Sequence, residues 1–212
     1  MNARSIEDKL REEYFKILPI VRRIKEQLEV KVHFNLIPIL NALKSHERIE
    51  VHSRIKDCES AINALRRRQE GSLFDEDKPD KYSLKQLPDL AGVRVLVFPR
   101  GLLNQVDDCI KKHFSSWKAN HVPGYKEDDE FQAFKYYGAC SQDLILGEIQ
   151  IVPMLTGLFW KVEHEAIYKP KPEFKNIADS FEMKECTQDV LDALKAFEKT
   201  FEKLCKSQNV DD

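Results

Sequence analysis

Hydrophobic residues in the first part of the chain recur every three or four positions, with charged residues between them. This spacing places apolar side chains on one side of a helix, and it predicts a helix over residues 4–46. Pro19 and Pro38 fall inside this range, and each should kink the helix or divide it, because proline lacks a backbone N–H. The same periodicity predicts further helices over residues 56–69, 102–114, 154–168 and 187–205.

A second pattern, of β-branched and aromatic residues, predicts the strands of a sheet. Residues 93–98 form an almost continuous apolar run, which is typical of a central buried strand. In another predicted strand, Glu148 and Gln150 would share one face, while the isoleucines beside them fill the other. The strands are expected over residues 49–53, 93–98, 131–137 and 144–152.

Together these patterns indicate a mixed α/β (α+β) fold, with a sheet of about four or five strands flanked by helices at both ends of the chain. Polar or proline-containing connections are expected at residues 72–82, 119–131 and 169–174. A chain of 212 residues can bury one sizeable core. We divide it into a helical N-terminal extension, a central domain that holds the sheet, and a C-terminal helix with a tail: residues 1–48, 49–175 and 176–212.

The charge balance narrows the class of partner. Lysine and arginine number 34 against 36 acidic residues, for a net charge of −2, so the globally basic surface of a DNA-binding protein is absent. No apolar run is long enough for a membrane span, and the polar N-terminus lacks the apolar core of a signal peptide. The 5 cysteines are scattered without metal-ligand spacing. We therefore expect a cytoplasmic protein with free thiols and no membrane or DNA partner.

The first cluster of candidate functional residues is basic, and it lies where the first predicted strand passes into the next helix. Arg54 and Lys56 would leave the strand on the same side, and the helix would turn Ser60 toward them. Arg66 and Arg67 follow about two helical turns later. Guanidinium and ammonium groups that converge in this way suit a polyphosphate. A solvated basic helix face is the alternative.

The second and third clusters supply carboxylates. Asp89 precedes the central strand and Arg94 lies within it, where an unpaired charge would be expensive to bury. Their alternative is a salt bridge between these two residues. Asp89 and Glu148 would lie side by side at one end of the sheet, and carboxylates there suit Mg²⁺ bound to substrate phosphates. Carboxylates beside several arginines and lysines describe a metal–polyphosphate transfer site, and the sequence contains neither a P-loop nor a Rossmann motif.

The segment that follows Glu148 is rich in polar and aromatic groups. Beyond Pro153, such residues recur at roughly helical spacing, which fits either the wall of an active site or an amphipathic surface helix. They include Trp160, Glu163, His164 and Lys169.

Four motifs in order resemble the synthetase domain of the RelA/SpoT family, the enzymes that make (p)ppGpp alarmones. The resemblance covers about residues 50–170, and the size resembles the small single-domain synthetases. It implies a nucleotidyltransferase-like fold and a transfer of pyrophosphate from ATP to the 3′-hydroxyl of GDP or GTP, with Mg²⁺. The motifs are R-x-K-x-x-x-S from Arg54, D-L-A-G-x-R from Asp89, E-x-Q from Glu148, and W-x-x-E-H-x-x-x-Y-K from Trp160.

The resemblance also implies roles for individual residues. Arg54 and Arg94 would clasp the ATP adenine from both faces, as guanidinium planes do well. Asp89 would hold Mg²⁺, and Glu148 would be the second metal carboxylate or the base that takes the 3′-hydroxyl proton. The ATP phosphates would be bound by Lys56, Ser60, Arg66 and Arg67. The acceptor side would be formed by Lys135, Tyr137, Gln150, Glu163 and His164.

The chain departs from the family pattern mainly on the acceptor side. Residues 135–141 lack the histidine that ends the family's tyrosine motif, so Tyr137 is expected to stack on the acceptor base, with Tyr125 as its competitor. Val152 and Pro153 replace a basic continuation, and Ala64 replaces a basic residue after the motif serine. These departures leave the acceptor open between GDP, GTP, an adenine nucleotide and the 3′ end of tRNA.

Two other functions remain open at this point. One is a toxin-like member that pyrophosphorylates adenine nucleotides or tRNA, and the other is a catalytically inactive, nucleotide-binding signalling protein. We also predict that the terminal helices can join copies of the chain into a homo-oligomer.

Overall fold

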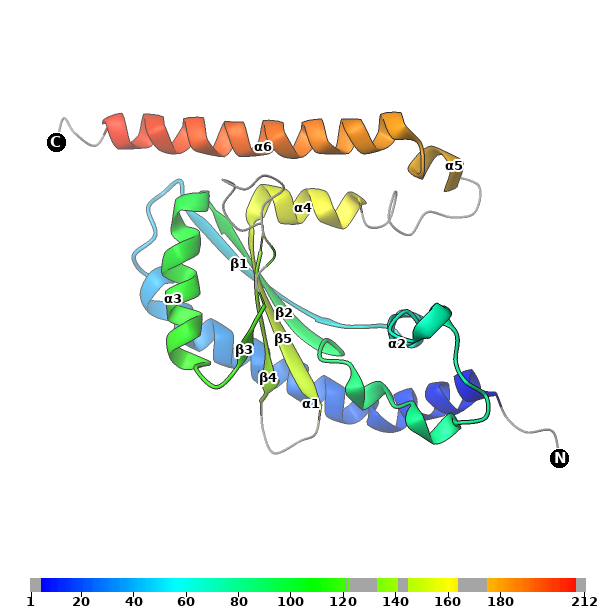
Figure 1. Ribbon diagram of the computed structural model, residues 1–212. Coiled ribbons are helices and arrows are strands. Elements are labelled where there is room, and N and C mark those ends of the chain that lie inside the picture. Colours follow the sequence, from blue (N-terminus) through cyan, green and yellow to red (C-terminus); the bar gives the residue numbers. More distant parts are fainter. Residues whose placement is uncertain (1–4, 121, 123–132, 141–144, 164–174, 209–212) are drawn as a thin grey trace.

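The computed structural model describes residues 5–120, 122, 133–140, 145–163 and 175–208. Its centre is a five-stranded sheet of order β1-β2-β5-β4-β3, in which β2 and β5 are parallel and the other neighbours antiparallel (Figure 1). The expected α+β class with a small mixed sheet is therefore confirmed. The strands are β1 Arg48–Ile55, β2 Ala91–Phe98, β3 Lys118–Ala119, β4 Phe134–Ala139 and β5 Leu146–Pro153.

Helices cover both sides of this sheet. In Figure 1, α1 and α3 lie on one side, while α4 and the long α6 lie on the other. None of the helices in the described ranges is both long and apolar enough to cross a lipid bilayer. The α-helices are α1 Ile6–Leu40, α2 Cys58–Arg66, α3 Leu103–His113, α4 Met154–Glu163, α5 Lys175–Ala178 and α6 Phe181–Gln208. Four short 3-10 turns are η1 Glu70–Ser72, η2 Pro79–Lys81, η3 Leu84–Gln86 and η4 Arg100–Leu102.

The first helix, α1, runs unbroken for 35 residues through Pro19 and Pro38, so the expected division of this helix is wrong. Each proline removes one backbone hydrogen bond, which disfavours the helix locally. Buried residues continue on both sides of Pro19, including Ile17 and Val21, and they pack into the same apolar core. Burial of this continuous face offsets the lost bond, because tertiary packing outweighs local propensity.

Most predicted strands and helices are found with shifted ends. β1 extends to Ile55, so Arg54 lies within the strand and not beyond its end. β3 was not predicted, and α6 begins at Phe181, earlier than the expected start at 187. Some predicted segments fall wholly or partly outside the described residues, namely 119–131, 164–168 and 169–174.

Alternate residues along the strands divide the sheet into two chemically different faces. The face toward α1 and α3 is apolar, and its members include Val93, Val95, Ile149, Ile151 and Tyr136. The opposite face carries the polar residues of β5, so the expected separation of Glu148 and Gln150 from the isoleucines is confirmed. The candidate site is built on this second face.

The last helix, α6, packs against α4 and η4 and does not lie on the sheet (Figure 1). Its buried residues are Leu191 and Glu198, and the ring of Phe201 contacts His46 and Phe98. Two further apolar residues of this helix, Phe197 and Leu204, are exposed. The homo-oligomer through the terminal helices stays a prediction.

Candidate active site

Three strands bring the polar residues of the site into two rows. In the first row, Arg54 of β1 and Glu148 of β5 lie on either side of Gly92 in β2. In the second row, His52 of β1 and Gln150 of β5 flank Arg94 in the same way. Because the rows are two residues apart along each strand, all these side chains project from one face.

The first row contains an ion pair that crosses the central strand. Arg54 Nη2 donates to Glu148 Oε2 at 3.1 Å. A Cβ atom on Gly92 would lie 3.6 Å from Arg54 Nε and 3.7 Å from Glu148 Oε2, in ordinary van der Waals contact, so the two groups meet directly over this residue. Only 3% of Glu148 is exposed, and a buried carboxylate requires such a partner.

The second row holds Arg94 through the side-chain amide of Gln150. Arg94 Nε and Nη2 both donate to Gln150 Oε1, at 3.0 and 2.9 Å. Burial lowers the pKa of the Arg94 guanidinium, the Arg54 charge adds to this effect, and Glu148 opposes it. The alternative of an Asp89–Arg94 salt bridge is not found, because Asp89 pairs with Lys56 instead.

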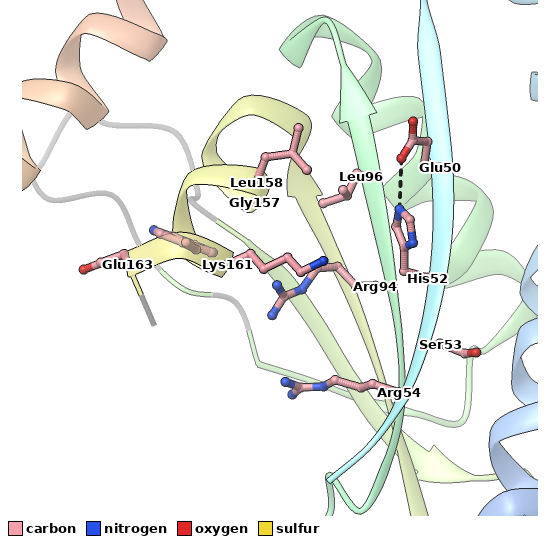
Figure 2. A pocket seen from close by; sticks show the side chains of 11 residues that line it. Glu50, His52, Ser53, Arg54, Arg94, Leu96, Gly157, Leu158, Lys161 and Glu163 are labelled. Carbon is pink, nitrogen blue, oxygen red and sulfur yellow. Dashed lines mark hydrogen bonds and ion pairs between the residues drawn. The ribbon is translucent and has the colours of Figure 1, made fainter. Parts of the chain in front are cut away.

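Both arginines face a pocket of about 660 Å³ between the sheet and α4, a size within the usual range for small-molecule sites. Figure 2 shows the guanidinium groups of Arg54 and Arg94 projecting in the same direction from neighbouring strands, with the Lys161 side chain reaching toward Arg94. The remaining lining comes from β1, β2 and α4: Glu50, His52, Ser53, Leu96, Gly157, Leu158, Trp160 and Glu163.

A second charged pair lies at the edge of the sheet where β2 begins. Lys56 follows β1, and its backbone N–H donates to Leu90 O at 2.9 Å, which fixes it beside the residues that precede β2. Its ammonium group forms an ion pair with Asp89 Oδ2. Asp89 Oδ1 is buried and has no hydrogen-bond partner among the described residues. Glu148 lies at the same edge, opposite Gly92, because β2 and β5 are parallel.

These carboxylates fit a magnesium ion that is shared with a substrate. Asp89 Oδ1 is a buried oxygen available as a ligand, and Glu148 supplies a second carboxylate. Within the described part of the chain, no group of three or more carboxylate, histidine or cysteine side chains is placed to hold a metal ion. Mg²⁺ typically takes one or two protein carboxylates and completes its shell with phosphate oxygens and water, so the residues present suit that arrangement.

The predicted phosphate-binding residues on α2 have different surroundings. Ser60 lies in its first turn, where the backbone N–H donates to Asp57 Oδ1 at 2.8 Å. Arg66 forms an ion pair with Glu7 of α1 and donates to Asn63 Oδ1 at 2.9 Å, which favours a structural role for this arginine. Arg67 is the exposed C-cap of the helix.

Among the residues predicted to form the acceptor side, β4 places Lys135 opposite Gln150 and Tyr137 opposite Glu148. Burial raises the pKa of Tyr137, and the charge of Glu148 and a hydrogen bond with it act in the same direction. Figure 2 shows the Glu163 carboxylate at the outer end of α4, away from the two guanidinium groups, and burial raises its pKa.

His164 and Tyr125 lie outside the described residues, so their predicted roles are not tested by the structure.

Sequence reasoning missed several groups near the site. Glu50 and His52 line the pocket and contact each other, with His52 Nε2 2.9 Å from Glu50 Oε2. The signal was present, because residues 50, 52 and 54 share a face once the strand is continued to Ile55. Lys161 carried no such signal. Arg68 directly follows the two arginines assigned to the phosphates, and its charge acts to lower the pKa of Tyr137.

Comparison with known proteins identifies the fold and no more. No family model and no curated protein sequence matches the chain. Small alarmone synthetase 1 from Bacillus subtilis, solved bound to its product pppGpp, superposes with a TM-score of 0.68 at 15% identity, covering 93% of this chain and 99% of that one. Small alarmone synthetase 2 from the same organism gives 0.64 at 18% identity, with 92% and 99% coverage. A GTP pyrophosphokinase family protein from Streptococcus pneumoniae gives 0.60 at 18% identity, with 94% and 98% coverage. The chain therefore has the fold of the small alarmone synthetases over almost its full length.

Proposed function

We propose that this protein is a Mg²⁺-dependent pyrophosphokinase that transfers pyrophosphate from ATP to the 3′-hydroxyl of GDP or GTP. The observation that carries this proposal is the arrangement on one sheet face. Arg54 and Arg94 project in the same direction toward a pocket of about 660 Å³, and Arg54 bonds the buried carboxylate of Glu148. The fold is the one found in a protein solved with pppGpp bound and in the same protein solved with the ATP analogue AMPCPP.

In the proposed reaction, the acceptor 3′-oxygen forms a bond to the β-phosphorus of ATP. The bond between that phosphorus and the α–β bridging oxygen breaks, and AMP leaves. Glu148 would accept the proton of the 3′-hydroxyl as the new bond forms, which is the role of a general base. Because transfer of this kind depends mainly on positioning and charge, the remaining residues act by holding the two substrates.

The charged groups match different parts of ATP. Arg54 and Arg94 would flank the adenine, since a guanidinium plane stacks well on an aromatic face. Lys56, with Ser60 and Arg67 on α2, would bind phosphate oxygens. Mg²⁺, when bound by Asp89 and Glu148, would offset the negative charge of the phosphates.

A second candidate is transfer to an adenine nucleotide or to the 3′ end of tRNA. The acceptor side supports this second candidate, because the residues after Gln150 supply no basic group. Val152 is fully buried and packs with Leu96 and Met154 under α4. Residues 151–153 therefore offer no charged contact that would select a guanine nucleotide.

One experiment separates these functions. The protein is incubated with Mg²⁺ and γ-labelled ATP together with GDP, GTP, ADP, AMP or deacylated tRNA, and the labelled product is identified. Label on GDP or GTP is the expected result, and label on an adenine nucleotide or tRNA would establish the second candidate. Saturable ATP binding without transfer to any acceptor would overturn both and indicate a nucleotide-binding signalling protein. A chelator arm with Mg²⁺ added back tests the metal, and transfer that survives chelation would remove Mg²⁺ from the proposal.

A further inference from the structure

Two adjacent tyrosines on β4 face opposite sides of the sheet, and each lies beside a carboxylate there. The hydroxyl of Tyr136 donates to Asp107 Oδ1 inside the apolar core, where Asp107 is 2% exposed. Tyr137 faces the site, where it lies directly across from Glu148 in the antiparallel register of β4 and β5, and the Glu148 carboxylate acts to raise the pKa of its hydroxyl. A tyrosine thus lies beside a carboxylate on both faces of the sheet, once in the core and once in the site.

The position of Tyr137 completes the surroundings of Glu148. Arg54 on β1 holds Oε2 of this carboxylate from one side, across Gly92. Tyr137 on β4 reaches it from the other side, since β4 and β1 flank the β2–β5 pair. A phenol is protonated near neutral pH and an ionised carboxylate only accepts hydrogen bonds, so in a bond between the two side chains Tyr137 would be the donor.

These two contacts differ in how firmly they can hold Glu148. The side chain of Arg54 is 46% exposed and lines the pocket, where it is expected to contact the nucleotide. Tyr137 is partly buried within the sheet and has only two side-chain torsions to fix. The contact from the sheet therefore orients the carboxylate independently of what occupies the pocket.

We propose that Tyr137 is a positioning residue that acts through Glu148, with its hydroxyl orienting the carboxylate toward the acceptor 3′-hydroxyl. The inference rests on the proposed function. It differs from stacking on the acceptor base, the role expected from sequence, because stacking uses the ring face and orientation uses the hydroxyl. The two roles can therefore be separated by removing one oxygen atom.

The test is Tyr137→Phe, which keeps the ring and deletes the hydroxyl. We expect kcat to fall about 10- to 100-fold, the usual loss when a residue that orients a functional group is removed. KM for ATP and for the acceptor should stay unchanged, because no substrate contact is lost. A wild-type kcat for Tyr137→Phe would overturn the proposal, and so would an effect confined to the acceptor KM. Rates are referred to the folded fraction measured by circular dichroism.

The neighbouring tyrosine provides the matched control. Tyr136→Phe deletes the same atom on the opposite face, where the hydroxyl bonds Asp107. This variant should unfold at a lower temperature while its folded fraction keeps the wild-type kcat. An equal loss of kcat in both variants would mean that Tyr137 acts only through the stability of the sheet, and it would overturn the proposal.

A second readout does not depend on activity. The melting temperatures of Tyr137→Phe, Glu148→Gln and the double variant form a double-mutant cycle. If the two side chains are directly bonded, the shifts in melting temperature of the single variants should not add up to that of the double variant. Additive shifts would contradict the contact itself. If the wild-type protein transfers no label to any acceptor, the proposed function fails, whereas this cycle still decides whether the hydroxyl and the carboxylate are coupled.

Discussion

The two faces of the sheet are built from the same strands, yet they obey different constraints. On the face toward α1 and α3, successive positions such as Val93, Val95, Ile149 and Ile151 form a continuous apolar core. On the other face, the intervening positions hold charged and amide groups that bond one another across three strands. The first face is held by burial of area, and the second by a set of specific polar partners.

This difference determines what a substitution can do. A core residue contributes through the volume it fills, so its loss affects the folding free energy. A residue of the site contributes through an oriented charge or hydrogen bond, so its replacement by an isostere affects function first. The neighbouring pair Glu148 and Ile149 represents this contrast within two consecutive residues of β5.

The largest expected effect comes from Glu148→Gln on the site face. The amide keeps the size of the side chain but cannot accept the acceptor proton, so we expect transfer to fall by about 10²–10⁴-fold. Initial rates at saturating ATP measure this, and circular dichroism should show a folded protein. Glu59→Gln is the control, because Glu59 is an exposed carboxylate on α2 that pairs with Arg11 on α1, away from the site. Retained transfer in Glu148→Gln would remove this residue from the mechanism.

Ile149→Ala should affect the opposite face. Ile149 is fully buried, and removing its side chain leaves a cavity that typically costs about 2–5 kcal/mol of unfolding free energy. Urea denaturation measures the loss, while KM for ATP in the folded protein should hardly change. Val162→Ala, at an exposed apolar position on α4, is the matched control. A much smaller loss for Ile149→Ala would show that the core near β5 can collapse around the gap.

A smaller effect is expected for Arg54→Lys. Lysine keeps the positive charge beside Glu148 but lacks the planar group that stacks on a base, an interaction worth about 0.5–2 kcal/mol. KM for ATP should therefore rise about 10-fold with a smaller change in kcat, as steady-state kinetics would show. Arg48→Lys, at the far end of β1 where the guanidinium bonds the carbonyl groups of Ser45 and Glu47, should leave KM unchanged. Equal KM values for the two variants would argue against the adenine clasp.

The smallest effect is expected for Arg66→Ala. Its ion pair with Glu7 is partly exposed, so its loss should reduce the unfolding free energy by no more than about 1 kcal/mol. Because Arg66 faces α1, KM for ATP should not change, whereas Lys56→Ala should raise it. A rise in KM for Arg66→Ala comparable to that of Lys56→Ala would return Arg66 to the phosphate site.

The fold was largely predictable because periodicity is local. The buried run at 93–98 and the alternation around Ile149 identified β2 and β5 correctly, and they also showed which residues share a face. The failure at Pro19 has a physical cause. The cost of a proline is local, but the packing that overrides it comes from residues brought together by the whole fold.

The site was predictable in part. The motifs singled out Arg54, Arg94, Glu148 and Gln150, and the structure brings all four together. The sequence could not show which way Arg66 points, because consecutive arginines on a helix project in different directions. The packing of α2 against α1 decides that Arg66 faces Glu7. The position of Tyr137 across from Glu148 could not be found from the sequence, since it depends on the register between β4 and β5.

By itself, the sequence determined the class of fold, the two faces of the strand that holds Glu148 and Gln150, and most of the charged residues of the site. These properties follow from side-chain spacing along one segment. The tertiary structure alone decided that Gly92 separates Arg54 from Glu148, that Asp89 meets Lys56, and that Tyr137 faces Glu148. These partners are distant in the chain, and their meeting depends on strand order and register, which are set by the burial of the whole sheet.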